Sequence, residues 1–145
     1  MSEFPRTMVG GVSLPRMIIG SNWFLGYSHT SLAQDQFIKS YQTRERITDI
    51  LTVFVERGID AVMSSPSEYF NDAIRAAEDR TGRAIIRIMT PSFNVIPGGP
   101  PEAEPEVMFD ECVRLGATFC MPHQCVTDAL IDRMTKEIRH MDRYS

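Results

Sequence analysis

Residues that could exchange protons or bind a metal gather in one short stretch, Cys120-Met-Pro-His123-Gln-Cys125. A histidine that directly follows a buried strand can act as a general acid or base near neutral pH. Its alternative role is structural, with the imidazole hydrogen-bonded to the backbone of a loop. Cysteine and histidine also bind zinc, but zinc sites usually combine two pairs of ligands, and the sequence shows no second pair. His123 is therefore the leading catalytic candidate.

Other polar side chains follow the remaining apolar runs, where a binding site is expected if those runs are parallel strands. Tyr69 is the second catalytic candidate, as a proton donor or as a group that orients a ligand. The candidate substrate-binding residues are Asn22, Trp23, Glu68, Thr90 and Gln124. Serine and glutamate at such positions also cap helices, and Ser65 with Glu68 has the spacing of a capping box. For that pair we favour the capping role.

The elements that must position these residues repeat four times. Apolar runs rich in β-branched residues, each followed by a segment of helical periodicity, cover 17–20, 59–64, 84–90 and 117–121. Strands that alternate with helices are typical of a parallel sheet covered by helices. Four such units are half of a TIM-type (βα)8 barrel, whose active sites lie at the C-terminal ends of the strands. The predicted fold is therefore α/β, with four βα units that form a half-barrel.

Periodicity and capping residues locate the helices of these units. Ser31 predicts one helix start, and Ser65 followed by Pro66 predicts another. The helices are expected over 32–41, along the apolar face 47, 50, 51, 54 and 55 up to Gly58, over 66–81, over about 105–115, and from about 127 to the final residue. The last helix is expected to turn Ile131, Met134, Ile138 and Met141 inward. The intervening stretch 91–105 contains five prolines and is expected to form a surface loop.

A β-hairpin is expected before the first parallel strand, because Gly10-Gly11 supplies the positive φ angles of a two-residue turn. We expect one domain over 1–145, in which 1–15 form the hairpin and 16–145 the four βα units. Neither glycine nor proline closes the predicted last helix. We therefore expect either that the chain is part of a larger barrel or that the half-barrel is completed by a second copy.

Composition excludes several classes of function. The net charge of −4 and the isoelectric point near 5.3 argue against nucleic acid as a partner, since phosphate binding requires a basic face. No apolar run is long enough to span a membrane or to form a signal peptide, which predicts a cytoplasmic protein. The three cysteines have no disulfide-scaffold spacing. The two lysines, Lys39 and Lys136, lie in predicted helices, which argues against Schiff-base chemistry on a strand.

The opening of the chain resembles the aldo/keto reductase superfamily of (βα)8 barrels. Residues 7–14 supply the bottom hairpin of that family, and the strand at 14–21 ends in its Gly-Ser step. The stretch 58–65 is similar to the second strand of the family, with Tyr69 a few residues beyond it. The resemblance covers about the first half of such a barrel, and its motifs are short.

The family reduces carbonyl compounds with a tetrad of Asp, Tyr, Lys and His at successive strand ends. The resemblance assigns the tyrosine to Tyr69 and the histidine to His123, each offset by one residue. Met63 occupies the aspartate position, and no lysine ends the third strand. NADP binds largely through the second half of the family's barrel, so the resemblance implies this cofactor only where such a half is present.

Together these observations predict a barrel-type protein that binds a small molecule. The resemblance narrows this prediction to an aldo/keto-reductase-like oxidoreductase with an incomplete tetrad. Two alternatives remain open. One is a non-catalytic half-barrel module completed by self-association. The other is a metal-dependent lyase or hydrolase that uses His123 with Cys120, Cys125 or Glu68.

Overall fold

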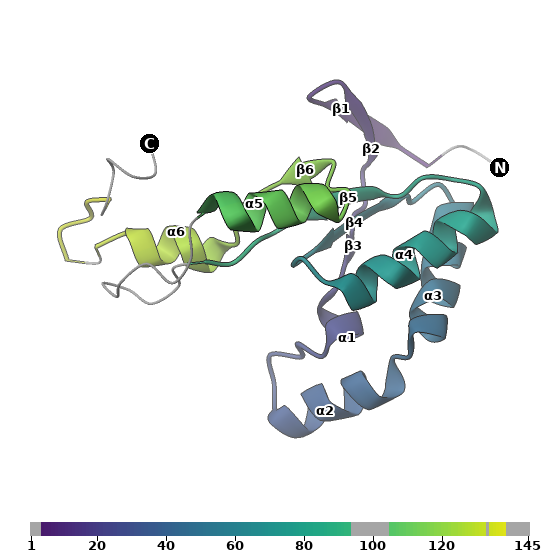
Figure 1. Ribbon diagram of the computed structural model, residues 1–145, viewed down its shortest axis with the longest axis horizontal. Coiled ribbons are helices and arrows are strands. Elements are labelled where there is room, and N and C mark those ends of the chain that lie inside the picture. The colour runs from purple at the N-terminus through teal and green to yellow at the C-terminus, as the bar shows by residue number, and fades with distance from the viewer. Residues whose placement is uncertain (1–3, 94–104, 133, 139–145) are drawn as a thin grey trace.

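The computed structural model describes residues 4–93, 105–132 and 134–138, and within them the chain is a mixed α/β protein (Figure 1). Four parallel strands pair in chain order, and two further strands form a separate antiparallel hairpin. The parallel strands are β3 (Ile19–Gly20), β4 (Ala61–Ser64), β5 (Ile86–Met89) and β6 (Phe119–Cys120), and the hairpin is β1 (Arg6–Val9) with β2 (Val12–Pro15). This confirms the predicted parallel sheet and hairpin, whereas closure into a half-barrel stays a prediction.

Helices separate the parallel strands, as the alternating pattern predicts. Three of them lie between β3 and β4, and single helices follow β4, β5 and β6. They are α1 (Asn22–Leu25), α2 (Leu32–Tyr41), α3 (Arg44–Glu56), α4 (Glu68–Thr81), α5 (Pro105–Arg114) and α6 (Gln124–Leu130). In Figure 1, α3 and α4 lie side by side near the sheet, and α6 lies well away from them. No helix in these described parts is long and apolar enough to cross a membrane.

The main hydrophobic core lies between the sheet and the helices α3 and α4. The face of α3 predicted from its periodicity is buried, as is the predicted face of α4. The fully covered side chains are Ile47, Leu51 and Val55 on α3, and Phe70, Ala73, Ile74 and Ala77 on α4. Burial of each large apolar side chain stabilises the fold by about 1.5–3 kcal/mol. A smaller cluster of Met89, Cys112 and Leu115 packs α5 against β5.

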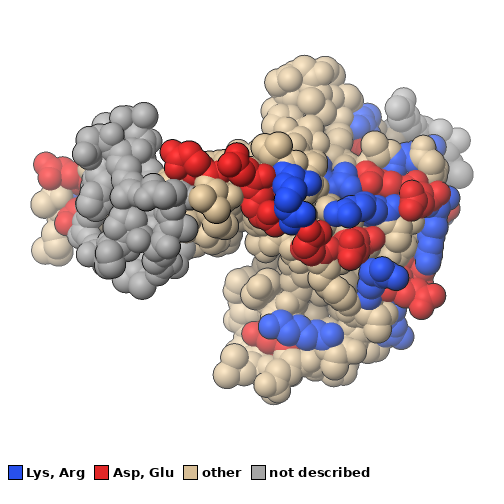
Figure 2. All heavy atoms as spheres, viewed as in Figure 1, with Lys and Arg blue, Asp and Glu red and all other residues tan. Residues whose placement is uncertain are grey.

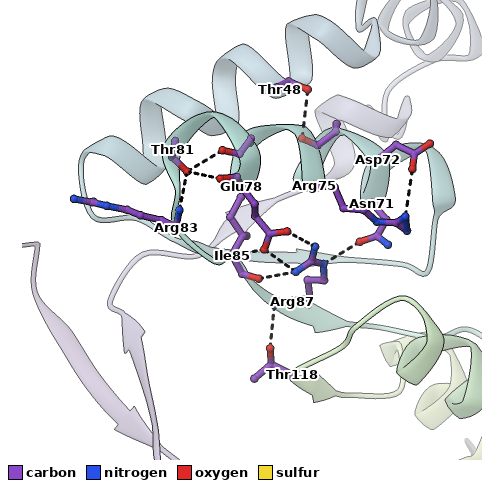
Figure 3. Close-up of polar contacts among 12 residues, drawn as sticks. Thr48, Asn71, Asp72, Arg75, Glu78, Thr81, Arg83, Ile85, Arg87 and Thr118 are labelled. Carbon is purple, nitrogen blue, oxygen red and sulfur yellow. Dashed lines mark hydrogen bonds and ion pairs between the residues drawn. The ribbon is translucent and has the colours of Figure 1, made fainter.

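A largely buried ionic network fixes α4 to β5 (Figure 3). Both terminal nitrogens of Arg87 donate to the Glu78 carboxylate, at 2.9 and 2.8 Å, and its Nε donates to Asn71 Oδ1 at 2.9 Å. Glu78 Oε1 also accepts from the backbone N–H of Ile85 at 2.7 Å. An arginine buried in this way is retained only when its donors are paired, because an unpaired charge in the core is costly.

The hairpin is held at the N-terminal ends of the parallel strands. Arg6 donates to the carboxylate of Asp60, just before β4, at 2.9 Å and to the Gly58 carbonyl at 3.3 Å. Gly10 and Gly11 have φ angles of 53° and 80°, which confirms the predicted turn. A Cβ added at Gly10 would lie 3.7 Å from the Phe119 ring, so the hairpin turn lies next to the start of β6.

Two predicted helix starts are wrong. The hydroxyl of Ser67, not that of Ser65, caps α4 by accepting from Phe70 N, so the helix begins at Glu68 and Pro66 precedes the cap. The last helix begins at Gln124, three residues earlier than expected, because His123 caps it. Each misplaced start comes from choosing among several adjacent residues that can accept a hydrogen bond.

The last helix also ends much earlier than predicted, at Leu130. The Asp132 carboxylate accepts from the N–H groups of Met134 and Thr135, which turns the chain, and Ile131 then pairs with Ile138 in an antiparallel bridge. Met134 is 90% exposed, so the predicted inward helical face does not exist there. Met141 and most of the proline-rich loop lie outside the described residues.

Replacement of Arg87 by alanine is expected to lower the free energy of unfolding by about 2 kcal/mol, because the partly buried Glu78 carboxylate loses two charged donors and keeps only the Ile85 N–H. Urea denaturation measures this loss. Arg80→Ala is the matched control, since its ion pair with Asp49 is exposed and should contribute less than about 1 kcal/mol. Equal losses in the two variants would contradict the role assigned to Arg87.

Candidate functional site

Backbone pairing beyond β5 and β6 positions the strongest candidate site. Backbone hydrogen bonds continue past the ends of the two strands. Met121 N–H donates to the Met89 carbonyl and His123 N–H donates to the Pro91 carbonyl, each at 2.9 Å. The parallel extension therefore places His123 level with the residues that follow β5. This is the C-terminal edge of the sheet, the edge at which the parallel strands end and where α/β sheets bind their ligands.

Three side chains meet at this edge and form what we call the thiol–imidazole cluster: Ser92, His123 and Cys125. The Nδ1 atom of His123 lies 2.9 Å from Cys125 Sγ and accepts the backbone N–H of Cys125 at 3.2 Å. Cys125 Sγ is in turn 3.7 Å from Ser92 Oγ. Because Nδ1 accepts a backbone N–H, these hydrogen bonds assign the neutral ring its proton at Nε2.

The imidazole thus has both roles that the sequence left open. It caps α6 through Nδ1, which is the structural alternative, and it lies exposed at the C-terminal edge of the sheet beside a thiol. Sequence reasoning considered Cys125 only as a metal ligand and missed it as the partner of His123. The usable signal was the spacing His-x-Cys after a strand, since a residue that caps a helix lies close to the residue two positions later.

The three cysteines have different surroundings. Cys112 is fully buried, Cys125 is half-buried and Cys120 is exposed. Burial, together with a hydrogen bond to Cys120, raises the pKa of the Cys112 thiol to about 12. Cys112 is therefore a protonated, unreactive thiol at neutral pH.

Tyr69 and Glu68 have partners elsewhere. The Tyr69 hydroxyl donates to the Gln42 carbonyl at 2.9 Å, which ties α4 to the link between α2 and α3. Glu68 forms ion pairs with Arg114 at 2.5 Å and with Arg75 at 3.4 Å, which joins the first turn of α4 to the last turn of α5. The capping box favoured for Glu68 is therefore replaced by these ion pairs, and neither residue is hydrogen-bonded to His123 in the described structure.

The remaining predicted binding residues do not converge on His123. Asn22 and Trp23 lie on α1, which Figure 1 shows well separated from α6. Asn22 Nδ2 lies 3.0 Å from His29 Nε2, and Trp23 is 57% exposed. Thr90 follows β5 and donates its N–H to the Ser64 carbonyl, whereas Gln124 is exposed beside His123. Of the predicted binding residues, only Thr90 and Gln124 thus lie on the two strand ends that form the cluster.

Hydrogen bonds between polar side chains hold the connection between α1 and α2 in place. The Asp35 carboxylate accepts from the Ser28 hydroxyl at 2.5 Å and from the Ser28 N–H at 2.7 Å. These two hydrogen bonds lower the pKa of Asp35, because they stabilise its charged form. Ser31 caps α2 by accepting from Gln34 N, as predicted. The arrangement therefore has a structural explanation, which is to fold the connection onto the first turns of α2.

Neither the surface charge in Figure 2 nor the arrangement of possible metal ligands indicates a further binding site in the described residues. Figure 2 shows acidic and basic residues interspersed over the face that carries α4, without a separate basic patch in that view. Within residues 4–93, 105–132 and 134–138, no three histidine, cysteine or acidic side chains are placed to hold a metal ion together.

Comparisons with known proteins return no match: no family model fits the chain, and neither the curated proteins nor the solved structures contain a detectable relative. The resemblance to aldo/keto reductases therefore stays a prediction from short motifs.

Replacement of Ser28 by alanine is expected to raise the pKa of Asp35 toward its ordinary value near 3.8, because the carboxylate loses a hydrogen-bond donor. NMR titration of the Asp35 side-chain carboxyl carbon measures the shift. A carboxyl group whose pKa is lowered by folding stabilises the folded state at pH values above its unfolded-state pKa. This stabilisation is lost as the pH falls through the folded-state pKa. The variant should therefore lose less stability than the wild type on acidification.

Thr30→Val is the control for this experiment, because Thr30 contacts the Ser28 hydroxyl and Gln34 but not Asp35. An unchanged Asp35 pKa in Ser28→Ala would contradict the assignment.

Proposed function

We propose that this protein binds a small polar carbonyl compound at the C-terminal edge of its parallel sheet, where His123 exchanges a proton with the compound. The observation that supports this most directly is the convergence of Ser92, His123 and Cys125 at the ends of β5 and β6. Parallel α/β sheets bind ligands outside the carboxyl ends of their strands. Side chains that can transfer protons therefore take part in catalysis or binding more often at this edge than elsewhere in the fold.

The hydrogen bonds of His123 define what it offers to a ligand. With Nδ1 occupied by the Cys125 N–H, the ring presents Nε2–H as a donor. A carbonyl oxygen is the matching acceptor, and a hydrogen bond from the neutral imidazole polarises the carbonyl. Full transfer of a proton to that oxygen requires the imidazolium form of His123. Reduction of that carbonyl, the reaction that the aldo/keto reductase resemblance implies, needs a hydride donor and stays a prediction.

The probes for this proposal are pyruvate and glyceraldehyde, which are small polar carbonyl compounds. Titration with one of them is expected to shift the side-chain nitrogen resonances of His123 saturably in NMR spectra. His123→Asn should abolish binding, measured by calorimetry, while its unfolding temperature stays close to that of the wild type. The reason is that asparagine keeps an acceptor for the cap of α6, whereas its shorter side chain cannot place a donor where Nε2–H lies.

Tyr69→Phe serves as the matched variant, because it removes a hydroxyl whose partner is the Gln42 carbonyl rather than His123. Binding should survive this change. The proposal is overturned if neither probe shifts the His123 resonances, or if Tyr69→Phe and His123→Asn weaken binding equally.

A second candidate function is self-association through the sheet, and one feature favours it. The face of the sheet that points away from the helices is covered only in part. On this face Ala61 and Ile88 are buried, Met63, Ile86 and Phe119 are half-buried, and Met121 is 50% exposed. Parallel sheets are usually covered on both faces. Within the described residues, β3 and β6 each pair with one neighbour only, so both edges can accept a strand of a second copy.

Analytical ultracentrifugation at low micromolar concentration tests this second candidate, and a dimer or larger closed assembly is the expected result. Met121→Lys should shift the equilibrium toward the monomer by placing a charge on the apolar face. Arg75→Glu on the opposite, helical side is the control and should leave the assembly intact. A monomer at all concentrations would rule out obligate self-association.

A further inference from the structure

We propose that Cys125 is a nucleophile that accepts an acyl group from a small activated acyl compound, with His123 as its base. The inference rests on the proposed function, since it assigns a reaction to the same edge of the sheet. The two proposals differ in one respect: acyl transfer requires a covalent bond to Cys125 Sγ, whereas carbonyl binding requires only His123.

The geometry contains the parts that nucleophilic catalysis requires. A nucleophile must lie within hydrogen-bond distance of a base, and a further group must hold the base in place. Cys125 Sγ is 2.9 Å from His123 Nδ1, within reach for transfer of the thiol proton. The single lone pair of Nδ1 accepts the Cys125 N–H in the structure, so uptake of the thiol proton replaces that hydrogen bond. The backbone bond from His123 N to Pro91 O then holds the residue in place.

The Ser92 hydroxyl lies where charge would develop. Its oxygen accepts from the Cys125 thiol, with 3.7 Å between Sγ and Oγ. Once the thiol has lost its proton, the hydroxyl proton of Ser92 is available to donate. When Sγ attacks a carbonyl carbon, the carbonyl oxygen becomes negatively charged one bond away from the new Sγ–C bond. A hydroxyl at this distance from sulfur is within reach of that oxygen, and donors aimed at such an oxyanion lower the barrier. This favours acyl transfer over simple alkylation of the thiol.

The reaction balances without an oxidant, a reductant or a metal. The Sγ–C bond forms as the bond from the carbonyl carbon to the leaving group breaks, and the thiol proton passes through His123 Nδ1 to the leaving group. Water then attacks the thioester, His123 takes a proton from the water, and Cys125 leaves as the thiol with release of a carboxylic acid. Each turnover therefore consumes one activated acyl compound and one water.

The other two cysteines provide internal controls. Cys120 is exposed like a reactive thiol, but it is hydrogen-bonded to Cys112 rather than to a histidine. Cys112 is buried, and its raised pKa keeps it protonated. Reagents that merely find an accessible thiol should therefore modify Cys120 at least as fast as the half-buried Cys125.

The test uses the whole chain under reducing conditions with p-nitrophenyl acetate. Release of p-nitrophenolate reports the rate, and peptide mass spectrometry identifies the acetylated residue. We expect acetylation of Cys125 in the wild type and in Cys120→Ala, and no enzymatic release in Cys125→Ala. His123→Asn should slow acetylation about a hundredfold, within the usual contribution of a general base. Ser92→Ala should slow it about a hundredfold, because it removes one donor to the oxyanion.

Acetylation of Cys120 at the same rate as Cys125, or a His123→Asn variant as reactive as the wild type, would overturn the proposal. The circular dichroism of each variant checks that it is folded. Pyruvate titration of Cys125→Ala separates this inference from the proposed function. If the His123 resonances still shift while the wild type is not acetylated, carbonyl binding stands and the acyl-transfer step fails. If the resonances do not shift but Cys125 of the wild type is acetylated, the acyl-transfer step stands and carbonyl binding by His123 fails.

Discussion

The paired charges of Arg87 and Glu78 set how the strands and helices of this protein fit together. Arg87 lies on the face of β5 that packs against α4, where its neighbours on the sheet, Ile85, Met89 and Val62, are apolar and buried. Its guanidinium can remain there only with its donors satisfied, so Glu78, Asn71 and the Ile85 carbonyl must surround it. That requirement fixes the rotation and height of α4 on the sheet more narrowly than apolar packing would, because apolar contacts have little directional preference.

The position of the thiol–imidazole cluster follows from the register of β5 and β6. Parallel pairing continues from the strands to His123 and Pro91, and this brings two loops of distant sequence level with each other. Ser92 reaches Cys125 only through that register. A shift of one residue would turn every side chain of β6 to the opposite face and separate the two. The site thus depends on the sheet, and the sheet depends on the helices that Arg87 and the apolar core hold against it.

Much of the fold was predictable because its signals are local or periodic. The apolar faces of α3 and α4, the cap of α2 at Ser31 and the turn at Gly10-Gly11 each depend on residues a few positions apart. The start of α4 and the end of α6 were predicted wrongly. Several capping residues compete at Ser65 and Ser67, and the Asp132 carboxylate turns a chain whose apolar spacing still suggests a helix. The candidate residues Tyr69 and Glu68 lie in the first turn of α4, after β4, but Tyr69 is bonded to the link between α2 and α3 and Glu68 to α5.

The sequence by itself determined the order of strands and helices, the faces they bury and the presence of His123 after the fourth parallel strand. These features depend on periods of two and 3.6 residues and on capping over a single turn, which a chain carries in any context. Only the tertiary structure decided that Cys125 and Ser92 accompany His123, that Asn22 and Trp23 lie apart from it, and that Arg87 is buried. Such contacts join residues that are distant along the chain, and they exist only once packing and register have fixed the elements in space.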